Sequence, residues 1–180
     1  MLNLEHERIM EIAVGMGELA VAESPHTLMA SGLGSCVAVI LYDEYSKIGG
    51  AAHIMLPYIE EALDQSNPAK FADVAICMLV DEMEKKGARI DCLTAKIFGG
   101  ANMFPQTIYP DSAMDVGCRN IAAVKEELEW FGIEIVAEDT SHHVSRTVQL
   151  DTNDGSVLVR TAYTTGEYLT DKYSSEEFYC

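Results

Sequence analysis

The chain has 180 residues, of which 48% are hydrophobic and 23% are charged, a composition typical of one globular domain and not of a disordered or fibrous protein. Its 12 Lys and Arg against 29 Asp and Glu give a formal net charge of −17. That charge argues against nucleic acid and anionic membrane surfaces as partners. The apolar stretches are too short to span a bilayer, and the start lacks the features of a secretory signal. We therefore expect a cytoplasmic protein with no membrane insertion.

The first third of the chain predicts strands joined by turns. An apolar-rich stretch at 9–19 predicts a first strand, which a proline turn follows. A second strand starts at Thr27 and leads through a glycine turn into the β-prone run 37–42, which we expect to be buried on both faces. A hairpin loop at 45–47 then leads to a return strand at 48–56.

The remainder predicts two helices and further strands. Asn67-Pro68 supplies a helix N-cap and a proline at the first helical position, and Gly87 ends that helix. Apolar residues spaced by three and four predict a second helix that ends at Gly132. The other expected strands are 93–98, 133–137 and a late hairpin of 146–150 with 156–160.

After Tyr163 the sequence turns to Thr, Gly, Ser, Tyr and acidic residues without apolar periodicity. We therefore expect one domain at 1–163 and an acidic C-terminal tail at 164–180. Because strands dominate and two helices lie between them, the expected fold class is α+β, with helices covering a strand-built core.

One cysteine is placed differently from the other four. Cys36 follows the glycine-rich turn Ser31-Gly32-Leu33-Gly34-Ser35 and begins a buried strand. Such a turn can direct the backbone N–H groups of Gly34 and Ser35 at one point, as an oxyanion beside a nucleophile requires. The five cysteines form no Cys-x-x-Cys pair, which favours reduced thiols over a disulfide framework or a structural zinc site.

His53 is the expected partner of this thiol. A hairpin around Tyr45 brings the start of one strand beside the end of the next, so the imidazole can reach the sulfur. An imidazole that takes the thiol proton lowers the cysteine pKa and supplies an acid for a departing amine. The spacing alone leaves a second interpretation open, in which Cys36 is a small core hydrophobe and His53 a hydrogen-bonded core residue.

No nucleotide or metal cofactor is expected. Gly15-Met16-Gly17 matches the start of a dinucleotide fingerprint, but Pro25 follows too soon for the helix that the motif requires. The turn before Cys36 leads into a strand and not a helix, so it cannot present a helix N-terminus to a phosphate. His142 and His143 lack a matching set of ligands and indicate a surface loop.

Taken together, these segments resemble the chemoreceptor glutamine deamidase family, CheD. The resemblance covers roughly residues 12 to 162. It is carried by Ser31-Gly32-Leu33-Gly34-Ser35-Cys36-Val37, Leu41-Tyr42-Asp43, Gly50-Ala51-Ala52-His53-Ile54-Met55-Leu56-Pro57, Lys96-Ile97-Phe98-Gly99-Gly100-Ala101, Gly117-Cys118-Arg119-Asn120 and Ile135-Val136-Ala137-Glu138-Asp139.

The resemblance implies hydrolysis of selected glutamine side chains to glutamate in the cytoplasmic domains of chemotaxis receptors, without a cofactor. It assigns the nucleophile to Cys36 and the histidine to His53. It also implies binding to a CheC-type phosphatase. The implied fold is a strand-built sandwich with helices outside, similar to the catalytic domains of glutamine-deamidating toxins.

One position departs from the family pattern. The family has a catalytic threonine six residues before the cysteine, and this chain has Ala30 there. Ser31 and Thr27 should face the other side of an extended strand. The third catalytic function is therefore left to a backbone carbonyl, a water molecule or a side chain from elsewhere.

Two alternatives to the deamidase stay open. A non-catalytic chemotaxis adaptor, which binds receptors or a CheC-type phosphatase, would explain Ala30. An amidase or protease with another substrate would share the chemistry of Cys36 and His53.

Overall fold

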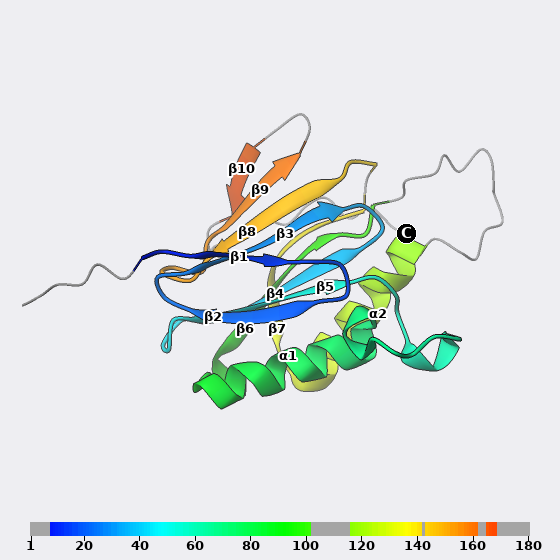
Figure 1. The fold of residues 1–180 in the computed structure, drawn as a ribbon, viewed down its shortest axis with the longest axis horizontal. Coiled ribbons are helices and arrows are strands. Elements are labelled where there is room, and N and C mark those ends of the chain that lie inside the picture. The colour runs from blue at the N-terminus through cyan, green and yellow to red at the C-terminus, as the bar shows by residue number, and fades with distance from the viewer. Residues whose placement is uncertain (1–7, 102–115, 142, 162–164, 169–180) are drawn as a thin grey trace, which may run out of the picture.

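The computed structural model describes residues 8–101, 116–141, 143–161 and 165–168, and two five-stranded sheets with two helices form its layers (Figure 1). The outer sheet has the order β1 (Glu11–Val14), β3 (Thr27–Leu33), β8 (Arg146–Asp151), β9 (Val157–Thr161), β10 (Thr165–Tyr168). The inner sheet has the order β2 (Leu19–Glu23), β5 (Ile48–Ile54), β4 (Val37–Asp43), β6 (Leu93–Gly99), β7 (Glu134–Thr140).

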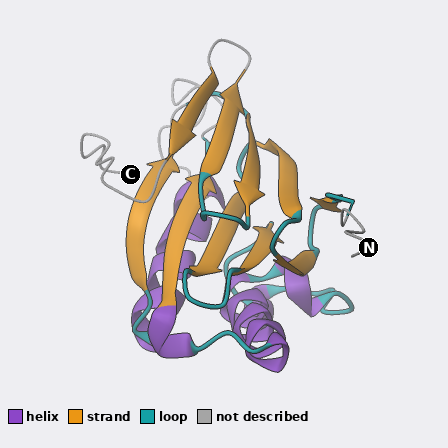
Figure 2. Cartoon of the chain, turned by 90° about the vertical axis from the view of Figure 1, so that its left-hand side faces the viewer, coloured by secondary structure: helices purple, strands orange, loops and turns teal. Residues whose placement is uncertain are grey.

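Both sheets are mixed. The pairs β1 with β3 and β6 with β7 are parallel, and the other pairs are antiparallel. The helices α1 (Ala72–Lys86) and α2 (Val116–Phe131) pack on the free face of the inner sheet, and Figure 2 shows helices below and behind the strands. Short 3-10 turns lie at η1 (Ile59–Glu61), η2 (Pro68–Lys70) and η3 (Ile90–Cys92). The predicted α+β fold, a strand-built sandwich with helices outside, is confirmed.

Two apolar cores hold these layers together, and the central strand β4 contributes to both. Val37, Val39 and Leu41 point toward the helices, whereas Ala38 and Ile40 point toward the outer sheet. Every residue of β4 and β5 is buried. The predicted strand buried on both faces is therefore confirmed, and its alternating side chains determine which residues face the outer sheet.

Glycines end both helices where the sequence predicts, but the predicted start of the first helix is wrong. Gly87 adopts φ 106° at the end of α1, and Gly132 adopts φ 69° after α2. Asn67 accepts a hydrogen bond from the Ala69 N–H, but the turn that it caps is η2, and α1 begins after it at Ala72.

Three further expectations need correction. The stretch 9–19 contains β1 and the start of β2, because a turn with Gly17 at φ 70° separates them. Residues 165–168 of the expected tail form β10, since pairing with β9 supplies main-chain hydrogen bonds that need no apolar periodicity. Residues 169–180 lie outside the described residues.

Cys36, Cys77 and Cys92 are free, but Cys118 is disulfide-bonded, so the expectation of reduced thiols was wrong for this residue.

Within the described ranges, no helix has both the length and the apolar character needed to cross a membrane.

Candidate active site at one end of the sandwich

The register of the β4–β5 hairpin brings Cys36 and His53 to the same face of the inner sheet. Ala38 pairs with His53, and Val37 pairs with Ile54. Ala38 belongs to the core between the sheets, and Cys36, two residues earlier, packs against that same core. The two side chains are thus diagonal neighbours across the hairpin, a relation in which Cβ atoms lie about 7 Å apart and long side chains can meet.

Cys36 is a half-buried free thiol. Burial raises its pKa above the ordinary value, and the thiol's interaction with its own backbone N–H offsets only part of that rise. The sulfur is therefore protonated at neutral pH, which differs from the thiolate expected from the sequence. The physical reason is that desolvation of the sulfur outweighs the favourable contacts available in this structure.

His53 is 1% exposed, and a backbone carbonyl orients its ring. Its Nδ1 lies 3.4 Å from the carbonyl oxygen of Val14. Because a carbonyl can only accept, this contact requires the proton on Nδ1 and leaves Nε2 as an acceptor. Nε2 is buried and has no hydrogen-bond partner among the described residues. The structure thus has an imidazole nitrogen available to take a proton.

Burial also lowers the pKa of His53, although the Val14 carbonyl and the negative charge of Glu18 oppose this shift. The imidazole is therefore neutral at pH 7. No hydrogen bond between Cys36 Sγ and His53 occurs in the described part of the chain, so the resting pair is a neutral thiol near a neutral base. Catalytic hydrogen bonds are often longer before substrate binds.

The loop before β4 is anchored through its carbonyl groups. Each of three successive carbonyl oxygens accepts one hydrogen bond: Gly34 O from Ala101 N at 2.7 Å, Ser35 O from Asn120 Nδ2 at 3.0 Å, and Cys36 O from Gly100 N at 2.8 Å. In a trans peptide the N–H points away from the preceding carbonyl. The anchored carbonyls therefore direct the N–H groups of Ser35 and Cys36 to the opposite side of the loop.

Those N–H groups differ in what they bind. The Gly34 N–H donates to Gly32 O at 2.9 Å, so it is engaged within the turn. The Cys36 N–H interacts with its own sulfur. The Ser35 N–H has no acceptor among the residues described. Of the two residues that the sequence suggested for an oxyanion, Ser35 has an available N–H, whereas Gly34 contributes its anchored carbonyl.

Two glycines allow the backbone after β6 to pack directly against the loop that carries Cys36. Gly99 adopts φ 105° and Gly100 adopts φ 63°, both in the left-handed region. A Cβ on Gly99 would lie 2.3 Å from the Cys36 carbonyl oxygen. That distance is too short for any side chain, so only glycine fits at this position. The segment Gly99-Gly100-Ala101 therefore approaches the nucleophile loop backbone to backbone.

Ala30 lies where its side chain faces the core between the sheets, with 1% of its surface exposed. It pairs with Val14 on β1, whose carbonyl contacts His53 Nδ1. Ser31 is exposed, as expected for the opposite face of the strand. Of the candidates left open from the sequence for the third function, a backbone carbonyl is the one in contact with His53.

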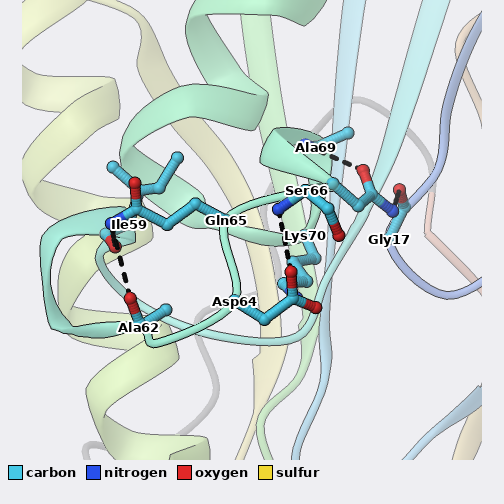
Figure 3. A network of polar contacts seen from close by, with 9 residues as sticks. Gly17, Ile59, Ala62, Asp64, Gln65, Ser66, Ala69 and Lys70 are labelled. Carbon is cyan, nitrogen blue, oxygen red and sulfur yellow. Dashed lines mark hydrogen bonds and ion pairs between the residues drawn. The ribbon is translucent and has the colours of Figure 1, made fainter.

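A neighbouring loop holds the backbone around His53, and Figure 3 shows the polar contacts within that loop and to Gly17. Asn67 Nδ2 donates to the Gly17 carbonyl at 3.0 Å, and the Gly17 N–H donates to the His53 carbonyl at 2.9 Å. Within the loop, Lys70 Nζ lies 3.3 Å from Asp64 Oδ2, and the Ser66 N–H donates to Asp64 Oδ1 at 3.0 Å (Figure 3). This network fixes the β1–β2 turn that carries the Val14 carbonyl toward the imidazole.

Several contacts at the site were not predicted. The sequence singled out the segments containing Gly99 and Asn120 without giving either residue a function, and nothing in a sequence marks the Val14 carbonyl. In the described residues, no group of three or more His, Cys, Asp or Glu is arranged to hold a metal ion. His143 is exposed, and His142 lies outside the described residues.

Comparison with known proteins gives a consistent result. The family model described as CheD chemotactic sensory transduction matches residues 55–161. A protein of Caldanaerobacter subterraneus subsp. tengcongensis, named probable chemoreceptor glutamine deamidase CheD, is 47% identical over 150 residues, which cover 83% of this chain and 92% of that protein. A protein of Methanococcus maripaludis strain C6 with the same name is 48% identical over 151 residues, which cover 84% and 95%.

Among solved structures, the crystal structure of a Neisseria meningitidis protein of the DUF152 family aligns with a TM-score of 0.49 and 12% identity. The alignment covers 76% of this chain and 65% of that one.

Proposed function

This chain belongs to the CheD family, and we propose that it hydrolyses glutamine side chains of chemotaxis receptors to glutamate with Cys36 as nucleophile and His53 as proton-transfer partner. The reaction class is that of a protein-glutamine glutaminase. The observation that carries the assignment is the β4–β5 register, which supports a shared face for the thiol and for an imidazole whose Nε2 is free.

In the first half of the proposed reaction, the sulfur attacks the carboxamide carbon while Nε2 of His53 takes the thiol proton. The carbonyl π electrons move to oxygen, and the Ser35 N–H donates to that oxyanion together with the Cys36 N–H, whose contact with its own sulfur ends as the sulfur attacks. Collapse of the tetrahedral intermediate breaks the C–N bond. The imidazolium returns its proton to the departing nitrogen, so ammonia leaves and a thioester joins Cys36 to the substrate.

In the second half, water replaces ammonia. His53 Nε2 takes a proton from the water as its oxygen attacks the thioester carbon, and the same N–H groups hold the second oxyanion. The C–S bond then breaks, and the proton returns to the sulfur. One water is consumed and one ammonia released per glutamine, and the thiol and the neutral imidazole are restored.

The neutral resting pair fits this sequence of steps. A raised pKa for Cys36 and a lowered pKa for His53 keep the proton on sulfur until a substrate carbonyl is in place. Proton transfer then accompanies attack and does not precede it. The Val14 carbonyl holds the proton on Nδ1, and the imidazolium that forms during the reaction strengthens that hydrogen bond.

The proposed partners are the cytoplasmic domains of chemotaxis receptors, because the curated relatives are named chemoreceptor glutamine deamidases. Binding to a CheC-type phosphatase stays a prediction from the family resemblance. An adaptor that binds receptors without chemistry is the alternative that Ala30 favours.

The proposed function is tested by mass spectrometry of a receptor cytoplasmic fragment incubated with the protein. We expect conversion of specific glutamines to glutamate with the unmodified chain and none with Cys36→Ala. Cys77→Ala, which removes an exposed free thiol on α1, is the matched control and should retain activity. Binding of the fragment without conversion would reject the deamidase in favour of the adaptor.

A further inference from the structure

Asn120 is a fully buried amide on α2 that links the segment before β4 to the segment after β5 at the candidate site. Its Nδ2 donates to the Ser35 carbonyl at 3.0 Å and to the Met55 carbonyl at 2.9 Å. Ser35 directly precedes the nucleophile, and Met55 lies two residues after His53. We propose that Asn120 is a positioning residue that holds Cys36 and His53 in register for catalysis. This inference rests on the proposed function.

The position of the two carbonyls explains why such a link is needed. The hydrogen-bonded pairing of β4 with β5 ends where Val37 pairs with Ile54, one residue short of Cys36. Continuing that register by one residue sets Cys36 opposite Met55. Strand pairing therefore stops just before the nucleophile. At that point the Asn120 amide bridges the two backbone segments, one at Ser35 and one at Met55.

The same bridge sets the direction of a catalytic N–H. The Ser35 carbonyl and the Cys36 N–H belong to one planar trans peptide, so they point in opposite directions. By holding that carbonyl from the α2 side, Asn120 directs the Cys36 N–H toward the side where the oxyanion forms. Loss of the hydrogen bond would free this peptide to rotate.

The chemistry of the site requires a donor at this position. Two carbonyl oxygens can only accept, so the NH2 group and not the oxygen of the amide must face them. The Oδ1 atom is buried and has no partner among the described residues. A buried acceptor without a partner lowers stability, so this residue is not the choice that stability alone favours. The two donated hydrogen bonds are its useful contribution.

The start of α2 is fixed against the same loop. A Cβ on Gly117 would lie 2.6 Å from the Gly100 carbonyl oxygen, so helix and loop are in close backbone contact there. Gly100 in turn donates its N–H to the Cys36 carbonyl at 2.8 Å. Asn120 therefore projects from an element that is itself held against the nucleophile loop.

The test compares Asn120→Ala and Asn120→Asp with a matched control, Thr152→Val. Asp keeps the volume of Asn but removes the donors when ionised, and it keeps the test open if the alanine variant does not fold. Thr152 is equally buried and also donates to a backbone carbonyl, that of His26 at 2.6 Å, at the other end of the sandwich. Each variant is assayed for melting temperature, for kcat and KM on the receptor fragment, and for iodoacetamide alkylation at Cys36 followed by peptide mass spectrometry.

We expect both Asn120 variants to lower kcat by about 100-fold, the scale of a misplacement near 1 Å, with little change in KM. Alkylation of Cys36 should become faster, because the released loop exposes the sulfur and its pKa falls toward the ordinary thiol value. Thr152→Val should lower the melting temperature and change neither kcat nor alkylation. A merely structural Asn120 would behave as Thr152 does.

Unchanged kcat and unchanged Cys36 alkylation in a folded Asn120 variant would overturn the inference. If the unmodified protein fails to convert any glutamine, the proposed function fails. The alkylation comparison would still report whether Asn120 holds the loop, because it does not depend on turnover.

Discussion

The two ends of the sandwich satisfy their buried polar groups differently. At the end where β4 finishes, Lys96 Nζ donates to the Gly155 carbonyl at 2.6 Å, and Tyr42 Oη donates to the Thr152 carbonyl at 3.1 Å. Asp43 accepts from the N–H groups of Tyr45, Ser46 and Arg89. Each of these polar side chains has a partner.

At the Cys36 end, three buried side-chain atoms have none among the described residues: His53 Nε2, Asn120 Oδ1 and Arg146 Nε. Arg146 belongs to this end because it pairs with Leu33, directly before the nucleophile loop. The same strands thus end once in a satisfied polar network and once in unsatisfied groups. Departures from full hydrogen bonding concentrate at functional sites, so the difference supports the proposal that the chemistry takes place at the Cys36 end.

After Cys36→Ala, which should abolish conversion, the largest expected effect at the Cys36 end comes from His53→Gln. Loss of the general base should lower kcat by about 10²- to 10⁴-fold, because the thiol proton then has no acceptor in the site. The assay is conversion of the receptor fragment at saturating concentration, with circular dichroism to check the fold. A folded variant with unchanged kcat would show that His53 takes no part in the mechanism. The proposed functional difference between the two ends would then fail as well.

Lys96→Met tests the opposite end. The substitution leaves the Gly155 carbonyl buried without its donor and should lower the free energy of unfolding by about 1–3 kcal/mol, measured by urea denaturation. kcat should not change, since Lys96 does not contact the Cys36 loop. A loss of kcat in this variant at full folding would show that the two ends are not separable.

The pH dependence of stability should report on the buried imidazole at the Cys36 end. Burial lowers the pKa of folded His53 below the ordinary 6.5, so below about pH 6.5 the unfolded chain binds more protons than the folded one. This contribution to stability is complete above that pH and declines as pH falls toward the folded pKa, by at most about 1.4 kcal/mol per pH unit. His53→Gln should show a shallower decline over the same range. Parallel curves for the two proteins would contradict the buried neutral imidazole.

Ala30→Thr should have the smallest effect. The Val14 carbonyl already contacts Nδ1, so a threonine at this position has no vacant function to fill and should not raise kcat greatly. Its extra atoms enter a buried site and should lower the free energy of unfolding by about 1 kcal/mol. A large gain in kcat would instead mean that Val14 is an inadequate substitute for the family threonine.

What the sequence could predict follows from how local each signal is. The shared face of Cys36 and His53 was predictable because a hairpin fixes its own register through the strand period of two. Asn120 was not, since its contact with Ser35 joins residues 85 positions apart. The Val14 carbonyl carries no side-chain signal at all. The strand β10 was missed because edge pairing depends on a neighbouring strand and not on apolar periodicity.

The protonation state of the pair was the other point that the sequence could not give. A cysteine beside a histidine suggests a thiolate and an imidazolium, but the burial of both groups shifts their pKa values the other way. Burial depends on the whole sandwich, with β1 and β3 covering the face that Cys36 and His53 share. Local spacing therefore predicted Cys36 and His53 as a candidate pair without predicting their charge.

The most direct test of the account is the capture of the covalent intermediate. A receptor fragment mixed with the protein, quenched with acid within the first turnover and digested, should yield a thioester adduct on the Cys36 peptide by mass spectrometry. The peptides of Cys77 and Cys92, the other free thiols described, should carry none. Undiminished conversion of glutamine by Cys36→Ala, with no adduct on the unmodified protein, would contradict the account.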